Sequence, residues 1–213
     1  MKRLNLKHLL AYVVGFPIFL AVVFFLTFPK FLFLDRELSK RNLYLTAEKV
    51  EESLTEVKLT GVNLYDQKSK LARFDTLRIS LSFFKVTVYG LCEGKPLRLG
   101  WSPFSISIRA DGFTCLRGLE ELSADLLAKE GIYGRINIKG IEVQDTKLDS
   151  LSLELKGRVF TARAKFMGTE LVGDGQIVFK RRDPLKSSLN GQVSGLGMRV
   201  LISGTLERPQ IMR

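Results

Sequence analysis

Hydrophobic and polar residues alternate along most of the chain from residue 43 onward. Leu77, Ile79 and Leu81, for example, alternate with Arg78 and Ser80. A period of two places the apolar side chains on one face of a strand and the polar side chains on the other. Similar alternation marks residues 86–88, 97–101, 106–109, 151–155, 160–166, 177–179 and 198–206. The pattern predicts a mainly β domain with a curled, mostly antiparallel sheet whose strands each bury one face.

Two segments depart from this alternation. The apolar phase switches between Leu81 and Val86, so we expect the strand to bend or bulge at Phe83-Phe84. Between residues 116 and 127, leucines recur at near-helical spacing, with acidic residues on the other side. The leucines are Leu116, Leu119, Leu122, Leu126 and Leu127, and the acids are Glu120, Glu121 and Asp125. This segment predicts one amphipathic helix, with Gly131 at the position of a C-terminal glycine cap.

Part of the sheet is predicted to be an internal repeat, near residues 55–83 and 134–156. Residues 57–66 (VKLTGVNLYD) match residues 136–145 (INIKGIEVQD), and residues 75–81 match residues 149–155. In both copies the apolar phase shifts at a glycine, Gly61 or Gly140, which predicts a β-bulge at each. Chance similarity between short alternating strands is the alternative explanation, and the sequence leaves it open.

A run without any charge occupies residues 9–28. A helix that crosses a membrane needs about 20 mainly apolar residues, so the run predicts a single transmembrane helix. The positions that define this anchor are Leu9, Val13, Phe16, Pro17, Phe19, Val23, Phe25 and Phe28. Lys2, Arg3 and Lys7 precede it and predict a cytoplasmic tail over residues 1–8. A cleaved signal peptide is the alternative, although the run exceeds the usual apolar region of about 7–15 residues.

The remainder of the chain is predicted to form a stalk and one domain on the far side of the membrane. Residues 29–42 begin with aromatic residues and end with charged ones, which is typical of a juxtamembrane stalk. Residues 43–213 then form the β-rich domain. The formal net charge is +11, which favours a position near anionic lipid head groups. The basic residues are spread along the strands, and this argues against a nucleic-acid-binding module.

The sequence offers little catalytic chemistry. Its one histidine, His8, lies in the predicted tail, so the domain has no imidazole for general base work or metal binding. Cys92 and Cys115 either form a disulfide in an oxidising compartment or remain two buried thiols. No metal-ligand spacing and no cofactor motif occurs. We therefore predict a protein that is not an enzyme, with no catalytic residues, no metal and no cofactor.

The apolar face of the sheet is what remains to carry a function. A sheet with one apolar face must bury that face against something. If the sheet curls on itself, the face becomes the packed core of a sandwich or barrel. If it stays open, the face forms a trough that suits an acyl chain or a partner strand. The sequence alone leaves both alternatives open.

Several segments make the chain resemble the type II secretion system protein N family of Gram-negative bacteria. The likeness rests on the basic tail, the single anchor and Thr27-Phe28-Pro29 at its exit. It continues through residues 59–64 (LTGVNL), residues 74–79 (FDTLRI) and residues 201–209 (LISGTLERP), while residues 92–129 match poorly. The resemblance implies a single-pass inner-membrane protein with a periplasmic β domain. It also implies an accessory role in protein secretion, exercised through contacts with other secretion-system components.

The repeats are also similar to those of AsmA-like envelope proteins. In that family, curled sheets form hydrophobic grooves for lipid. This similarity implies an alternative function, in which the domain binds or conducts lipid.

Overall fold

The computed structural model describes residues 16–17, 19–20, 30–40, 42–67, 69–82, 84–143, 146–180, 183, 186–195, 198–206 and 208–212. In this part of the chain, helix α2 (Lys30–Ser39) directly precedes a single sheet of 15 strands. The first strands are β1 (Tyr44–Thr46), β2 (Lys49–Glu52), β3 (Glu56–Tyr65), β4 (Lys70–Ser82) and β5 (Lys85–Cys92). They are followed by β6 (Lys95–Ser102), β7 (Ser105–Phe113), β8 (Glu121–Ala128), β9 (Ile132–Val143) and β10 (Thr146–Gly157). The last are β11 (Val159–Phe166), β12 (Thr169–Val178), β13 (Ser188–Gly195), β14 (Met198–Thr205) and β15 (Pro209–Met212).

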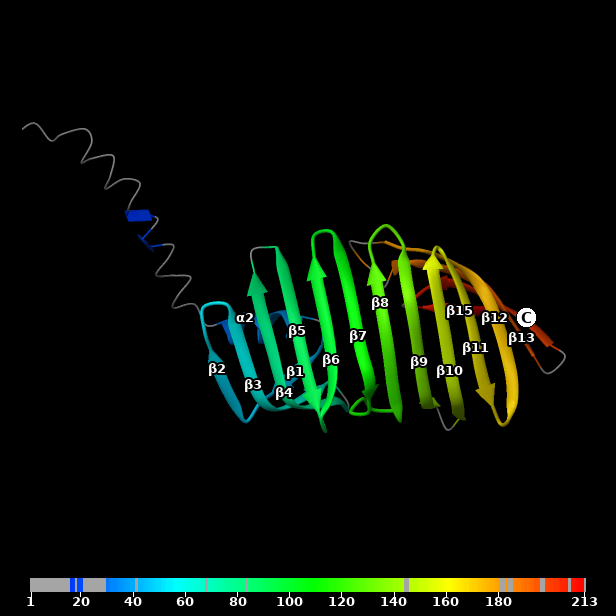
Figure 1. Cartoon of the computed structure of the whole chain (residues 1–213), viewed down its shortest axis with the longest axis horizontal. Helices are drawn as coiled ribbons and strands as arrows, with labels where there is room; N and C mark the ends of the chain where they lie inside the picture. Colours follow the sequence, from blue (N-terminus) through cyan, green and yellow to red (C-terminus); the bar gives the residue numbers. More distant parts are fainter. Residues whose placement is uncertain are drawn as a thin grey trace, which may run out of the picture.

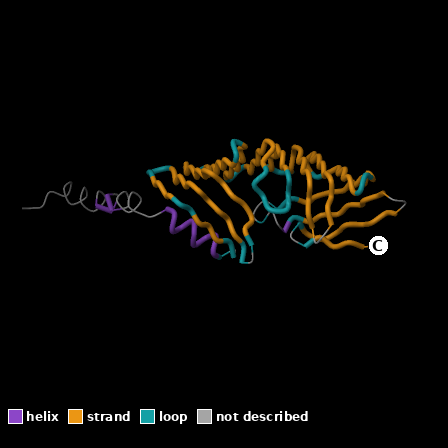
Figure 2. Tube along the Cα trace, turned by 90° about the horizontal axis from the view of Figure 1, so that it is seen from below, coloured by secondary structure: helices purple, strands orange, loops and turns teal. Residues whose placement is uncertain are grey.

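The sheet is an antiparallel meander. From β3 to β15, every strand pairs with the strands before and after it in the chain, while β1 and β2 both pair with β3 (Figure 1). The described strands do not close into a barrel, because β15 and the β1–β2 end are not paired with each other. Both ends of the sheet bend toward the same side, and α2 lies on that side (Figure 2). The fold is therefore mainly β, antiparallel and open.

Helix α2 lies within the predicted stalk and covers the first strands. The backbone N–H groups of Lys30 and Phe31 each donate to a carboxylate oxygen of Glu52, at 3.1 Å. A carboxylate at this position is favourable because the helix N-terminus carries partial positive charge and unpaired N–H groups. Phe31 and Leu34 pack against the core of the sheet. These contacts fix the start of the helix beside β2.

The predicted amphipathic helix over residues 116–127 is wrong. Residues 121–128 form strand β8, and only a turn-rich loop precedes it. Leu122, Ala124, Leu126 and Ala128 alternate with outward-facing residues, so the true period is two. The helical spacing is only apparent, because it combines the leucines of the loop with those of the strand and omits the small alanines of the same face. Gly131 accordingly lies in the β8–β9 turn and caps no helix.

The chain reverses direction where the sequence predicts a bend, because Ser82 pairs with Lys85; Phe83 itself lies outside the described residues. Strand β4 ends at Ser82 and β5 begins at Lys85, so the switch of phase marks a reversal of the chain. A true register shift occurs instead in β7, between Ala110 and Phe113, where Gly112 has a φ of +58°. The Gly112 N–H donates to the hydroxyl oxygen of Ser123 at 3.1 Å. This irregularity has no counterpart in the repeat pattern of the sequence.

The two matched segments of the sequence adopt the same local structure. Gly61 and Gly140 both have left-handed backbone, with φ of +62° and +58°. Each is contacted by a glutamate side chain, from Glu48 and Glu120 respectively. The N–H of Glu48 donates to the carbonyl oxygen of Thr60, and the N–H of Glu120 donates to that of Lys139, at 2.9 and 3.0 Å. Shared contacts of this kind are not expected from chance similarity of strands.

The phase change at these glycines differs from the predicted bulge. Register pairs continue on both sides of Gly61 without an inserted residue, since Thr60 pairs with Thr76 and Val62 with Phe74. The alternation of inward and outward residues on the paired strand β4 therefore shifts at the same place, at Asp75. The second copy behaves alike, with Asp149 facing Gly140. Each aspartate accepts a backbone N–H from a later hairpin turn. Asp75 accepts that of Glu93, in the β5–β6 turn, at 2.7 Å, and Asp149 accepts that of Gly168, in the β11–β12 turn, at 3.4 Å.

We predict that Gly140→Ala destabilises the domain more than Gly168→Ala does. Both glycines have positive φ, so each alanine adds strain of about 1–2 kcal/mol. A Cβ at Gly140 would also lie 2.2 Å from Cδ of Glu120 and displace that side chain from Lys147, whereas a Cβ at Gly168 meets nothing within 4 Å. Thermal unfolding of the full chain in detergent, followed by circular dichroism, measures the difference. Equal losses for the two variants would show that the glutamate contact is unimportant.

Candidate functional site

The described residues contain no group of three or more metal-binding side chains. Three shallow depressions indent the polar face of the sheet, and the largest has a volume of about 480 Å³. It is lined by residues such as Val159, Asp174, Gln192 and Leu201, without a convergent set of ionisable groups. The feature of the fold that is suited to binding is the opposite face, on the side toward which the sheet bends.

Strand pairing aligns the apolar side chains of this inner face into rows that cross the sheet. The first row contains Leu59, Leu77, Gly90, Leu97, Ala110, Ala124, Ile136, Leu153, Ala162, Gly173, Val193 and Val200. The second contains Val57, Ile79, Val88, Leu99, Ile108, Leu126, Gly134, Leu155, Phe160, Gly175, Gly191 and Ile202. Neither row has a polar side chain. The inner face is therefore a continuous apolar surface from β3 to β14.

Only part of this surface is covered by the described protein. At the N-terminal end, Val57, Leu59, Val62 and Phe113 are almost fully buried beneath α2 and the loop before β8. A second small cluster is buried around Leu155, Phe160 and Ile177. Between and beyond these clusters the inner residues are half-buried, and Leu99 is 37% exposed. Apolar area exposed in this continuous form usually marks a binding surface.

The side chains of the inner face become smaller toward the C-terminal strands. Its members there include Ala162, Gly173, Gly175 and Gly191. The ring of Phe160 occupies the space that side chains at Gly175 and Gly191 would need, since their Cβ atoms would lie 2.6 and 2.8 Å from it. Phe160 therefore fills the space above these two glycines, whereas large side chains line the N-terminal strands.

The outer face has the opposite character. A row of facing residues there contains Lys58, Arg78, Tyr89, Arg98, Arg109, Asp125, Arg135 and Glu154. Arg109 pairs with Asp125 at 3.1 Å, and the Arg98 guanidinium lies 5.1 Å from the centre of the Tyr89 ring. A hydrogen bond from Lys139 lowers the pKa of Glu121, and one from Lys156 lowers the pKa of Glu154. This face is charged and solvated, in contrast to the apolar inner face.

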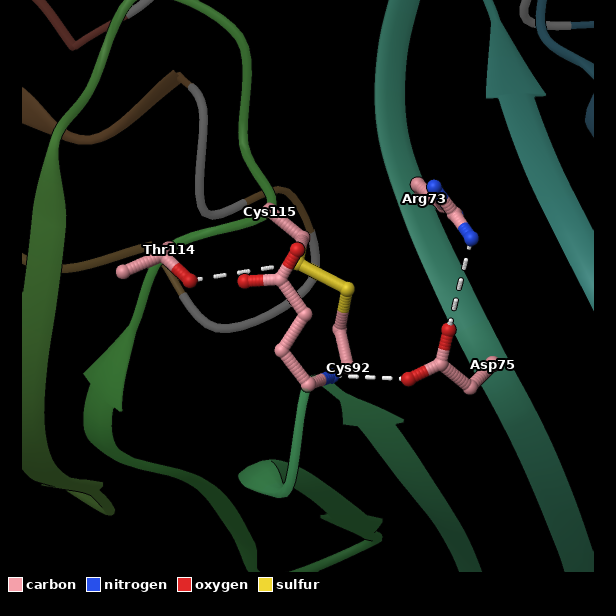
Figure 3. A network of polar contacts seen from close by, with 6 residues as sticks. Arg73, Asp75, Cys92, Thr114 and Cys115 are labelled. Atoms are coloured by element: carbon pink, nitrogen blue, oxygen red, sulfur yellow. Dashed lines mark hydrogen bonds and ion pairs between the residues drawn. A yellow bond between two sulfur atoms is a disulfide. The ribbon is translucent and has the colours of Figure 1, made fainter.

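A disulfide ties the covering loop to the sheet. Cys92, at the end of β5, is bonded to Cys115 in the loop before β8, with 6.3 Å between their Cα atoms (Figure 3). Asp75 lies beside the bond, where it accepts the N–H of Glu93 and approaches Arg73 at 3.9 Å. The loop also pairs with β4, because the N–H of Arg73 donates to the carbonyl oxygen of Cys115. The sequence left this pair open between a disulfide and two thiols.

Most of the predicted membrane segment lies outside the described residues. Leu9, Val13, Val23, Phe25 and Phe28 are not described, and neither are Lys2, Arg3 and Lys7. Phe16, Pro17 and Phe19 belong to short pieces of helix. Among the residues that are described, no helix combines the length and the hydropathy needed to cross a bilayer.

Comparison with known proteins gives this chain one relative that covers nearly all of it. An "Uncharacterized protein" of Aquifex aeolicus (strain VF5) is 33% identical over 195 residues, which are 91% of this chain and 89% of the Aquifex chain. The two proteins belong to one family. No family model and no solved structure matches the chain. The family is therefore defined by a shared sequence of nearly full length.

Sequence reasoning identified the strands that build the inner face but not its full extent. The sequence predicts a helix where strand β8 lies, and this prediction interrupts the row of apolar residues at Ala124 and Leu126. The alternation of Leu122, Ala124, Leu126 and Ala128 was the signal that would have restored it. The second missed feature is the loop of residues 114–119, which covers part of the inner face and has no periodic pattern in the sequence.

Proposed function

We propose that this protein binds lipid by holding acyl chains against the inner face of its open sheet. The observation that carries the proposal is the uninterrupted apolar surface from β3 to β14, together with the half-exposure of its central residues. Apolar chains lying on this surface would remove it from water, and each buried methylene contributes about 0.8 kcal/mol. No polar group on the inner rows would have to lose its hydrogen bonds.

The proposal includes a place in the cell envelope. The uncharged run of residues 9–28 would anchor the protein in the inner membrane, with the β domain on the periplasmic side. A disulfide between Cys92 and Cys115 supports an oxidising compartment, because such bonds are rare in the cytosol. A membrane anchor would also keep the apolar surface close to a source of lipid.

Photo-crosslinking of adjacent residues tests this function. Ile108 lies on the inner face and its neighbour Ser107 lies on the outer face, within the same strand. We expect benzoylphenylalanine at position 108 to form adducts with phospholipid in cells, and the same residue at position 107 to form none. Mass spectrometry of the purified full chain identifies the adducts. Equal labelling at both positions, or none at either, would overturn the proposal.

A second candidate is an accessory role in a secretion system, supported by the free side of β15. Within the described residues this strand pairs with β14 alone, so its other side offers unpaired backbone groups to a partner strand. Deletion of the gene would then lower protein secretion. Normal secretion combined with altered envelope lipid content would favour lipid binding instead.

A further inference from the structure

We infer that one rim of the sheet, near its N-terminal end, rests in the surface of the membrane. The inference rests on the proposed anchoring by residues 9–28 and extends it to the orientation of the domain. In an antiparallel meander, alternate turns lie along the same rim. We define the upper rim as the turns that contain Leu54, between β2 and β3, Phe84, between β4 and β5, and Phe104, between β6 and β7, at the top of the sheet in Figure 1.

Each of these three turns presents a large apolar side chain to solvent. Leu54 is 55% exposed and Phe84 is 73% exposed, and Phe104 is exposed to a similar extent. Their neighbours in the turns are mostly uncharged, including Ser53, Thr55, Ser102 and Pro103. Leu and Phe side chains flanked by small polar groups are suited to the boundary between head groups and acyl chains. A soluble surface has no need of such apolar tips on three neighbouring turns of one rim.

The opposite rim, at the same strands, is charged. Its turns contain Asp66, Glu93, Arg117 and Glu120. Transfer of these groups into a bilayer surface would cost far more than transfer of the upper rim. The upper rim is therefore apolar and the opposite rim charged, as expected if the upper rim contacts the membrane.

The position of α2 brings the upper rim to the membrane. The backbone nitrogen of Lys30 lies 3.1 Å from the Glu52 carboxylate, and Glu52 is two residues before Leu54. The uncharged run ends at Phe28, two residues before Lys30. If residues 9–28 span a bilayer, the surface of that bilayer must therefore lie close to the Leu54 turn. No comparable tether exists for the opposite rim within the described chain.

The contact would also join the bilayer to the inner face. Trp101 is on the inner face, three residues before Phe104, and it is 54% exposed. It pairs across the sheet with Val86 and Ile106, which are the inner residues nearest the upper rim. Apolar surface is therefore continuous from the tips to the rows that we propose hold acyl chains. A lipid could pass from the membrane onto the sheet without exposing its chains to water.

Depth-dependent fluorescence quenching of a single tryptophan tests the inference. Trp101 is the one tryptophan of the chain, so Trp101→Phe gives a silent background. In this background Phe84→Trp places the probe on the upper rim, and Met167→Trp places it on the opposite rim, at a turn residue that is 81% exposed. The full-length variants are reconstituted into phosphatidylcholine–phosphatidylglycerol vesicles whose acyl chains are brominated near the head groups. Leu54→Trp provides a second upper-rim probe, should Phe84→Trp fail to fold.

We expect strong quenching and a blue-shifted emission for the upper-rim probes, and neither for Met167→Trp. Quenching at Met167→Trp alone would overturn the inference by showing the reverse orientation. Absence of quenching at both rims, in protein that still floats with the vesicles, would overturn the rim contact while anchoring stands. Protein that does not float would overturn the anchoring. None of these outcomes depends on the adducts at position 108, so failure of lipid binding on the inner face is recognised separately.

Discussion

Leu99→Lys is expected to remove most of the phospholipid that co-purifies with the protein, whereas Leu127→Lys leaves it in place. The two leucines are exposed to nearly the same extent, 37% and 38%, but Leu99 faces inward from β6 and Leu127 faces outward from β8. A lysine among acyl chains costs about 3 kcal/mol, which corresponds to more than about a hundredfold in affinity. Native mass spectrometry of the detergent-solubilised full chain measures the bound lipid.

The pair of variants separates lipid on the sheet from lipid around the anchor. Both proteins retain residues 9–28, so lipid that adheres to this run contributes equally to both spectra. Both substitutions are at partly exposed positions, and circular dichroism should show the same β content for each. Equal lipid retention by Leu99→Lys and Leu127→Lys would mean that the inner face does not hold the lipid.

Loss of the Cys92–Cys115 bond is expected to lower the stability of the domain by about 3 kcal/mol, in line with a loop of this length. The sequence separation is 23 residues, and the bond closes strands β6 and β7 into that loop. Cys92 is fully buried, so the double variant Cys92→Ala, Cys115→Ala also loses some packing. For a chain of this size the midpoint of thermal unfolding should fall by roughly 6–12 °C.

Reduction of the natural protein provides the independent comparison. Dithiothreitol should shift the unfolding midpoint of the natural protein toward that of the double variant, and it should leave the variant itself unchanged. A midpoint that does not respond to reduction would show that the loop before β8 is held by its packing and its hydrogen bonds to β4 instead.

The strands of this fold were readable because each carries its own pattern. Residues such as Leu151, Leu153 and Leu155 alternate with polar neighbours, and a strand with one solvated face requires that pattern. The repeat was detectable for a similar reason, since Gly61 and Gly140 must adopt positive φ where few other residues can. Local rules of this kind act within a few residues, so they survive in the sequence.

The features that escaped prediction depend on residues that are distant in the chain. Glu48 and Glu120 appear in the sequence as ordinary acids, and only the fold shows that each packs on a glycine of the next long strand. Closure of the sheet was equally beyond the sequence. Whether β15 meets β1 depends on the accumulated twist and bending of all intervening strands, which no single strand encodes.

The length of the inner face sets how many molecules it accommodates. The N-terminal part of the rows is covered by α2 and the loop before β8, so the available length runs from β6, where Leu99 is exposed, to β14. Strands in a sheet are about 4.8 Å apart, which makes this length on the order of 40 Å. Lipid tails span only about 15 Å in one leaflet of a bilayer. Roughly two to three tails would then fit end to end, and the rows offer no polar group that would favour one register over another. Saturation should accordingly be gradual, with a distribution of stoichiometries instead of a single complex.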